Sequence, residues 1–189
     1  MKTLPPRIET ERLLLRAYVA ADAGSLSALI SRNQDELIDS FPKMVARVAA
    51  RGDAAGHIQE RSELWSARKY FSYGIWTRSG GAPVGEITFK NIDWEIPSGE
   101  LGYLIDAGHR RKGFAREAMR ALTAACFESL GFRRIFVRVF PDNGSSLALA
   151  QSAGFVREGV HRNDFLSGKG QVRDLVYLSM TDEDWRGAQ

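Results

Sequence analysis

The sequence contains very few residues that bind metals or form cross-links. Its 189 residues include one cysteine, Cys126, and three histidines, His57, His109 and His161. A single cysteine excludes an internal disulfide framework, and the three histidines lack the spacing of a zinc site. We therefore expect neither a disulfide scaffold nor a structural metal.

Long apolar runs are also missing. Residues 1–6 lack the apolar stretch of a secretory signal, and no later run approaches the length needed to cross a bilayer. We therefore expect a cytoplasmic protein that does not contact a membrane. Residues 7–185 contain no internal repeat, low-complexity tract or linker-like change in composition. With 44% apolar and 26% charged residues, the chain suffices for one core, so we predict that residues 1–189 form a single domain.

Positive charge is concentrated in one short segment. The net charge of +3 fits either a nucleic acid or a phosphorylated cofactor as a partner. The basic residues form a cluster with a glycine inside it, rather than a stripe interleaved with aromatic residues. This distribution favours a local phosphate site, and we expect no nucleic-acid partner. The cluster comprises His109, Arg110, Arg111, Lys112, Arg116 and Arg120.

The periodicity of apolar residues predicts a mixed α/β fold. Expected strands cover residues 12–16, 70–77, 84–92, 100–105, 135–140, 155–160 and 172–180. Expected helices cover residues 21–32, a segment from about residue 54 within 45–69, a segment from 113 that stops before 131, and 145–152. The order β-α-α-β-β-β-α-β-α-β-β indicates a mixed sheet of about seven strands with helices on both faces. Residues 8–11 are expected to form a turn, and residues 70–105 an antiparallel meander.

The most specific feature is the segment Arg110 to Ala115, between an expected strand and an amphipathic helix. Such a junction presents unpaired backbone amides at the start of the helix, where the helix dipole adds positive potential. Gly113 allows the backbone to approach a ligand closely, and the neighbouring cations supply countercharge. The segment therefore suits a pyrophosphate, although a solvated basic helix start would have the same composition.

This segment resembles the coenzyme A motif of the GNAT-type N-acetyltransferases, Arg/Gln-x-x-Gly-x-Gly/Ala. Arg110, Gly113 and Ala115 match it. The resemblance extends over nearly the whole chain and is strongest to the ribosomal-protein N-terminal acetyltransferases of the Rim type. The supporting stretches are residues 8–16, 99–105, 143–146 and 153–155, together with Asp174.

The resemblance implies a GNAT fold that uses acetyl-CoA. In that fold the strand ending at Ile105 and the strand starting near Ile135 splay apart, and the pantetheine arm lies between them. The backbone of residues 103–105 would bind the pantetheine amides, and an amide there would polarise the thioester carbonyl. Taken alone, the alternating apolar side chains of this strand favour ordinary core packing. The implied cofactor-binding residues are Tyr103, Leu104, Ile105, Arg110, Arg111, Lys112, Gly113, Phe114, Ala115, Arg116, Asn143 and Ser146.

Asn143 and Ser146 form an Asn-x-x-Ser pair at the start of an expected short helix. The resemblance implies that Asn143 hydrogen-bonds the pantetheine arm and that the Ser146 hydroxyl lies near the sulfur. A hydroxyl in that position can protonate the departing thiolate. The alternative is structural, because asparagine before a helix is a common N-cap.

An attacking amine also requires a general base within reach, directly or through one water. Glu100 opens the strand at the expected cleft and is our first candidate; Glu86, on the neighbouring strand, is the second. Either residue is equally compatible with an exposed strand carboxylate. Cys126 lies on the apolar face of its helix and is interpreted as core. We therefore expect direct attack of the amine on the thioester in a ternary complex, without a covalent enzyme intermediate.

The acceptor is a primary amine, and the resemblance implies a protein N-terminal α-amine. A small-molecule amine such as an antibiotic or a polyamine is the alternative within enzymes, and a non-catalytic coenzyme A sensor or a nucleic-acid module is the alternative outside them. Residues 38–68 and the loop 91–98 are expected to select the acceptor. In that loop Trp94 and Glu95 either line the acceptor cleft or form a solvated turn. The length of the acyl donor and the choice between monomer and homodimer stay open.

Overall fold

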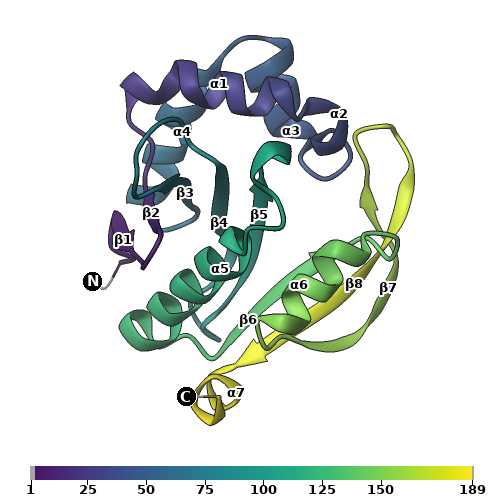
Figure 1. Ribbon diagram of the computed structural model, residues 1–189. Helices are drawn as coiled ribbons and strands as arrows, with labels where there is room; N and C mark the ends of the chain where they lie inside the picture. The colour runs from purple at the N-terminus through teal and green to yellow at the C-terminus, as the bar shows by residue number, and fades with distance from the viewer. Residues whose placement is uncertain (1–2, 189) are drawn as a thin grey trace.

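The computed structural model describes residues 3–188, and its central feature is a sheet of eight strands (Figure 1). The strands are β1 (Arg7–Glu9), β2 (Leu13–Arg16), β3 (Phe71–Thr77), β4 (Gly85–Asp93), β5 (Ser98–Ile105), β6 (Arg134–Val139), β7 (Val156–Leu166) and β8 (Val172–Thr181). Their spatial order is β1-β2-β3-β4-β5-β6-β8-β7. The predicted mixed sheet is confirmed, with one strand more than the seven expected.

The only parallel pair of strands in this sheet, within residues 3–188, is β5 with β6. This pair is short, because the two strands separate after three matched positions (Figure 1). The paired residues are Ser98 with Arg134, Gly99 with Ile135 and Glu100 with Phe136. The expected splay between these strands is therefore present, and it leaves one edge of β5 unpaired from residue 101 onward.

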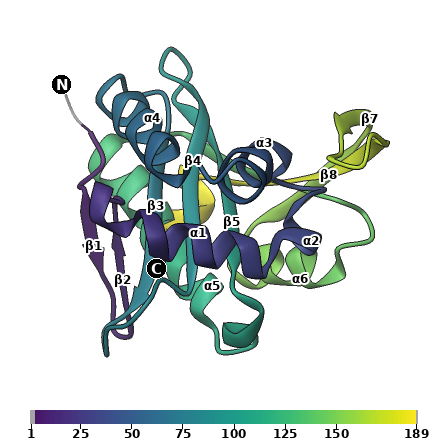
Figure 2. The same ribbon diagram turned by 90° about the horizontal axis from the view of Figure 1, so that it is seen from above.

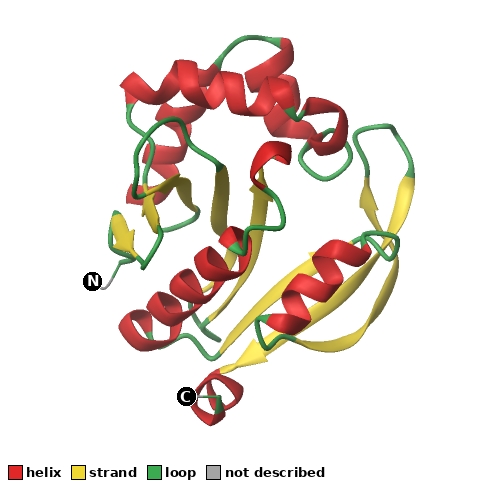
Figure 3. Ribbon diagram, in the orientation of Figure 1, coloured by secondary structure: helices red, strands yellow, loops and turns green. Residues whose placement is uncertain are grey.

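Helices cover both faces of the sheet, as predicted (Figure 2). They are α1 (Ala23–Arg32), α2 (Gln34–Leu37), α3 (Pro42–Met44), α4 (Ala54–Ser66), α5 (Phe114–Ala124), α6 (Gly144–Ser152) and α7 (Asp182–Gly187). A 3₁₀ turn at Ala20–Asp22 precedes α1, another at Ala107–His109 follows β5, and π-helical turns occupy Val45–Ala50 and Ala125–Leu130. Figure 3 shows α1 to α4 as one group, separate from α5 and α6.

The two helical groups contribute to two different apolar clusters. The larger cluster packs Met119 and Leu122 of α5 against strand residues such as Tyr73 and Ile87. The smaller one joins α1, α4 and the segment between them, and its strand contribution is Leu104 of β5. Because successive strand residues point to opposite faces, β5 contributes to both clusters and separates the two layers.

Local signals account for where several elements begin. Asp53 accepts a hydrogen bond from the backbone NH of Gly56 at 2.9 Å, so α4 begins at Ala54, as predicted. Gly113 precedes α5 with φ of +79°, a conformation that glycine adopts without strain. The meander β3-β4-β5 is also confirmed.

Some boundaries differ from the prediction. Residues 8–11 were expected to form a turn, but Arg7–Glu9 forms β1 and pairs antiparallel with β2. Its short length and mostly exposed side chains gave no apolar alternation. Ser98 and Gly99 belong to β5 rather than to the preceding turn, and β7 continues well beyond residue 160. Helix α7 was not predicted; Thr181 caps it, accepting from the Asp184 amide at 3.2 Å.

Candidate active site

A cleft opens between β5 and β6 where their pairing ends. It has a volume of about 110 Å³ and is lined by residues 100–103 of β5, residues 137–139 of β6, and Asn143 and Ser146 at the start of α6. Because β4 pairs with only one edge of β5, the backbone NH and CO groups of alternate residues beyond Glu100 face this cleft. The expected pantetheine-binding stretch, residues 103–105, lies on this free edge.

The side chains of that stretch have different surroundings. The Tyr103 hydroxyl crosses the cleft and donates a hydrogen bond to Ser146 Oγ at 3.1 Å. Burial raises the pKa of Tyr103, so its phenol is neutral and keeps a proton near the serine. Leu104 and Ile105 pack against the two apolar clusters, as the packing alternative predicted. The tyrosine hydroxyl is a polar group of the cleft that the sequence pattern did not reveal.

Asn143 acts as the N-cap of α6. Its Oδ1 accepts hydrogen bonds from the Ser146 amide at 3.1 Å and from Ser145 Oγ at 3.0 Å. The capping role that the sequence offered as the alternative for Asn143 is therefore present. The same residue also lines the cleft, so the cap holds Asn143 and Ser146 together beside the open edge of β5.

Glu100 is buried at the base of the cleft among positively charged and amide groups. Its side chain is 5% exposed and lies 2.9 Å from an Arg138 guanidinium nitrogen and 3.4 Å from Lys90 Nζ. Asn91 Nδ2 donates a further hydrogen bond to it at 2.6 Å. Glu100 is thus a fixed, charge-compensated carboxylate that touches the cleft, rather than an exposed strand residue.

Glu86 lies on the same face of the sheet but outside the residues that line the cleft. It is 3% exposed, and its Oε2 has no hydrogen-bond partner. Burial raises the pKa of Glu86 to about 7, against the opposing influence of Arg61, Ser72 and Lys90. It is therefore a carboxyl group that changes charge near neutral pH.

The basic loop connects β5 to α5. Arg111 and Gly113 both have positive φ values, +60° and +79°, and no side chain caps the first turn of α5. The charges of Arg111, Lys112 and Arg116 are exposed and have no carboxylate partner within residues 3–188. Phe114 and Ala115 are partly buried at the helix start. Free amides and unpaired cations in one place form a site for an anion.

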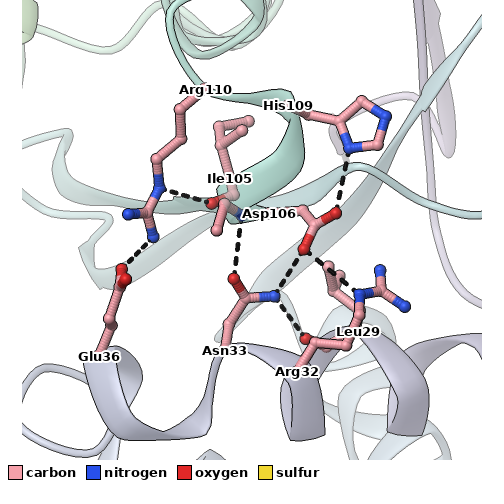
Figure 4. Close-up of polar contacts among 9 residues, drawn as sticks. Leu29, Arg32, Asn33, Glu36, Ile105, Asp106, His109 and Arg110 are labelled. Carbon is pink, nitrogen blue, oxygen red and sulfur yellow. Dashed lines mark hydrogen bonds and ion pairs between the residues drawn. The ribbon is translucent and has the colours of Figure 1, made fainter.

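A buried hydrogen-bond network fastens this loop to the end of α1 (Figure 4). Asn33, which is 4% exposed, donates to Asp106 Oδ1 at 2.8 Å and to the Leu29 carbonyl at 2.8 Å. Its Oδ1 accepts from the Ala107 amide at 3.0 Å. Asp106 also contacts His109 Nδ1 at 3.0 Å. The hydrogen bonds of Asn33 and Asp106 therefore fix residues 106–109, the part of the loop that precedes its cationic residues.

The turn between β7 and β8 reaches the segment after α2 (Figure 1). A Cβ placed on Gly168 would lie 2.0 Å from the Ile38 carbonyl oxygen, and Lys169 Nζ donates to Asp39 Oδ2 at 2.7 Å. Lys169 holds the pKa of Asp39 below its usual value. Residues 40–41 and Phe165, which line the cleft, lie close in sequence to this bridge, which is formed by residues 38–39 and 168–169.

Other expected residues lie elsewhere. Trp94 and Glu95 do not line the cleft: the Trp94 indole donates to the Arg68 carbonyl at 3.1 Å and its ring packs on Phe132, while Glu95 is exposed. The indole instead fastens the β4–β5 turn to Arg68 and Phe132, outside this cleft. Cys126 is fully buried in the core, as expected, and burial raises its thiol pKa.

Neither a membrane-spanning helix nor a metal-binding cluster occurs in the described part of the chain. None of the helices within residues 3–188 is long and apolar enough to cross a membrane. The same residues contain no group of three or more histidine, cysteine or acidic side chains placed to hold a metal ion.

A family model described as an acetyltransferase (GNAT) domain matches residues 12–156. The chain is 32% identical to the uncharacterized N-acetyltransferase YoaA of Bacillus subtilis, over 83% of this chain and 86% of that protein. A shorter match, 32% identical over 40% of this chain and 42% of the relative, is to the ribosomal-protein-serine acetyltransferase of Escherichia coli. The solved structure of RimL, a ribosomal L7/L12 α-N-protein acetyltransferase in complex with coenzyme A, superposes with a TM-score of 0.83 at 21% identity, covering 93% of this chain and 97% of that one.

Proposed function

The chain belongs to the acetyltransferase (GNAT) family, and on this premise we propose that it acetylates the α-amine at the N-terminus of a protein. Membership of the family makes it an N-acetyltransferase that uses acetyl-CoA and an amine acceptor. The proposal concerns the identity of that acceptor and the residues that perform the reaction. It rests on the cleft, the basic loop and the bridge between residues 38–39 and 168–169.

The basic loop is the proposed site for the phosphate groups of acetyl-CoA. Its features fit a phosphorylated ligand, since the amides at the start of α5 are uncapped and Arg111, Lys112 and Arg116 have free charges. Gly113 provides the close backbone approach, and Phe114 and Ala115 form the base of the site. Arg110 differs from these residues, because its charge already has a partner.

The open edge of β5 is the proposed site for the pantetheine arm. Residues 103–105 offer backbone groups that β4 does not use, and Asn143 lies on the opposite wall. Acetyl-CoA supplies the activated acyl group, and a β5 amide directed at its carbonyl would stabilise the charge that develops there.

Glu100 and Ser146 are the proposed acid–base pair. Glu100 is the carboxylate that touches the cleft, so it is the group placed to accept the amine proton, directly or through water. Ser146 lies across the cleft and is the proposed proton donor to the leaving thiolate. The neutral Tyr103 phenol, which donates to Ser146 Oγ, can resupply that proton.

The bridge is the observation that supports a protein N-terminus as the acceptor. Because Gly168 and Lys169 contact the segment after α2, two segments that lead into the lining of the cleft are joined beside it. A contact of this kind beside the cleft favours an acceptor that enters by its end and disfavours an amine in the middle of a folded surface. An N-terminal α-amine also has a pKa low enough to leave a useful neutral fraction near pH 7.

The experiment that tests this function measures acetyl-CoA turnover as release of free thiol. Acceptors are a panel of peptides with free N-termini, the same peptides with blocked N-termini and one internal lysine, polyamines and aminoglycosides. We expect release with a subset of the free N-termini only. Release with the lysine peptides or with polyamines would replace the proposed acceptor, and release with none of them despite tight coenzyme A binding would leave this acceptor class without support.

A further inference from the structure

Arg110 differs from the other cations of the basic loop because its charge is already paired. Its guanidinium forms an ion pair with Glu36 of α2, and its Nε donates to the Ile105 carbonyl at 3.3 Å (Figure 4). Arg111, Lys112 and Arg116 have no such carboxylate partner within the described residues. One cation of the proposed phosphate site is therefore occupied by an anion from the protein itself.

The Asn33 network fixes the backbones that carry this pair. Asn33 lies three residues before Glu36, and the Ala107 amide that it binds lies three residues before Arg110. Asn33 and its partner Asp106 are both buried, 4% and 7% exposed. Glu36 and Arg110 thus extend from two anchored segments, so their pairing follows from the fold and not from chance proximity of two long side chains.

The pair itself is easily exchanged. The side chains of Arg110 and Glu36 are 44% and 56% exposed, and water screens an ion pair at such positions. A phosphate offers an arginine more negative charge and several acceptor oxygens, and arginine binds such groups through two parallel hydrogen bonds. An incoming phosphate is therefore a stronger partner for Arg110 than the Glu36 carboxylate.

We propose that Glu36 is an internal competitor for the cofactor's phosphate groups: it holds Arg110 in the free enzyme and is displaced when acetyl-CoA binds. The inference rests on the proposed function, because it requires the phosphates to bind at the loop. Glu36 weakens cofactor affinity by the free energy of its pair with Arg110. It also places an acidic group of α2, the helix that leads to residues 40–41 of the cleft, beside the bound phosphates.

The test compares coenzyme A affinity by calorimetry in the wild type, Glu36→Gln and Asp35→Asn. Asp35 is the matched control, because it lies beside Glu36 on α2, is exposed, and forms no ion pair within residues 3–188. Both substitutions remove one negative charge and change the long-range field equally. We expect Glu36→Gln to bind coenzyme A about two- to fivefold more tightly than Asp35→Asn, the range that an exposed ion pair provides.

The mechanism is tested further by repeating the comparison in an Arg110→Ala background. If Glu36 acts through Arg110, the difference between Glu36→Gln and Asp35→Asn disappears there and decreases with added salt in the parent protein. Equal affinities of the two variants in the parent protein, or a difference that persists without Arg110, overturn the inference and leave the proposed cofactor site standing. A wild type that fails to bind coenzyme A overturns both.

Discussion

Glu86 and Glu100 are buried to a similar degree in neighbouring strands, yet their surroundings compensate a negative charge to different extents. They lie on the same face of the sheet, since Glu100 is paired with Lys90 and Glu86 is four residues from Lys90 on β4. Glu100 has Arg138, Lys90 and Asn91 within contact distance. One Glu86 oxygen has no partner, and burial raises the pKa of this group to about 7.

The comparison shows that depth alone does not decide what a buried carboxyl group does. Removal from water disfavours the charged form at both positions, and only nearby cations and donors offset that cost. At Glu100 these partners come from β6 and β4, and two of them, Arg138 and Lys90, also line the cleft. At Glu86 the neighbouring cations do not offset the burial, so the group takes up a proton near pH 7.

The largest effect is expected when Glu100 loses its nearest cation. Arg138→Met removes the guanidinium at 2.9 Å and leaves a buried carboxylate with weaker compensation, which we expect to lower the free energy of unfolding by about 3 kcal/mol. Urea denaturation at pH 7 measures this change in the free energy of unfolding. The double variant Arg138→Met with Glu100→Gln should recover most of the loss, because no uncompensated charge remains. If the double variant is no more stable, the loss arises from packing and the charge argument fails.

Glu86→Gln should have the opposite effect on stability, and this effect should grow as the pH rises from 4.5 to 7. The pKa of Glu86 is raised in the folded protein, from 4.5 to about 7, so its contribution to stability is complete below pH 4.5 and is lost as pH rises through 7. Glutamine carries no such dependence. At pH 8 we expect the variant to be more stable than the wild type by up to about 3 kcal/mol, and equally stable at pH 4.

Urea denaturation of both proteins from pH 4 to pH 8 measures this difference. Subtracting one curve from the other removes the contributions of the remaining titrating groups, including His57, whose pKa burial lowers to about 4. Glu95→Gln, an exposed position, is the control and should give a flat difference. A flat difference for Glu86→Gln as well would show that Glu86 is already compensated in the folded protein.

The same substitution at the two glutamates should show which of them takes part in catalysis. We expect Glu100→Gln to lower kcat by about 100-fold with little change in the KM for acetyl-CoA, the effect of removing a general base. Glu86→Gln should keep its turnover and its pH profile, because Glu86 does not line the cleft. The measurement is thiol release from pH 5 to pH 9. Loss of an inflection near pH 7 in Glu86→Gln alone would assign the base to Glu86.

The sequence predicted the parts of this arrangement that depend on local pattern. Alternating apolar residues located the strands, and the run from Arg110 to Ala115 located the junction before α5. Glu100 was expected on the strand that borders the cleft, and the structure has it there. Residues 7–9 were missed as a strand because they are short and mostly exposed, so they carry no apolar alternation.

The partners of each glutamate were beyond sequence reasoning, because they depend on strand register. Arg138 meets Glu100 only because β6 pairs in parallel with β5 over three positions, a match set by distant packing. The Tyr103 contact with Ser146 and the bridge between residues 38–39 and 168–169 likewise join segments far apart in the chain. Local pattern therefore located the candidate residues, and tertiary structure set their charges and contacts.

Lys90 is the residue that connects the two glutamates, and its removal should have the smallest effect. Its Nζ lies 3.4 Å from Glu100 Oε1, and its charge also lowers the pKa of Glu86. Lys90→Met should destabilise the protein by about 1 kcal/mol at pH 8, less than Arg138→Met because the closer cation remains. It should also move the Glu86 transition to higher pH.

Urea denaturation of Lys90→Met in the wild-type and Glu86→Gln backgrounds shows how much of the lost stability involves Glu86 and how much involves Glu100. Lys43→Met, at an exposed position, is the control. If Lys90 serves both carboxyl groups, its removal costs more at pH 8 than at pH 5 in the wild type, and this difference disappears in the Glu86→Gln background. A cost that is the same in both backgrounds would mean that Lys90 stabilises Glu100 alone. Lys90 would then have no effect on the ionisation of Glu86, although it lies on the same strand.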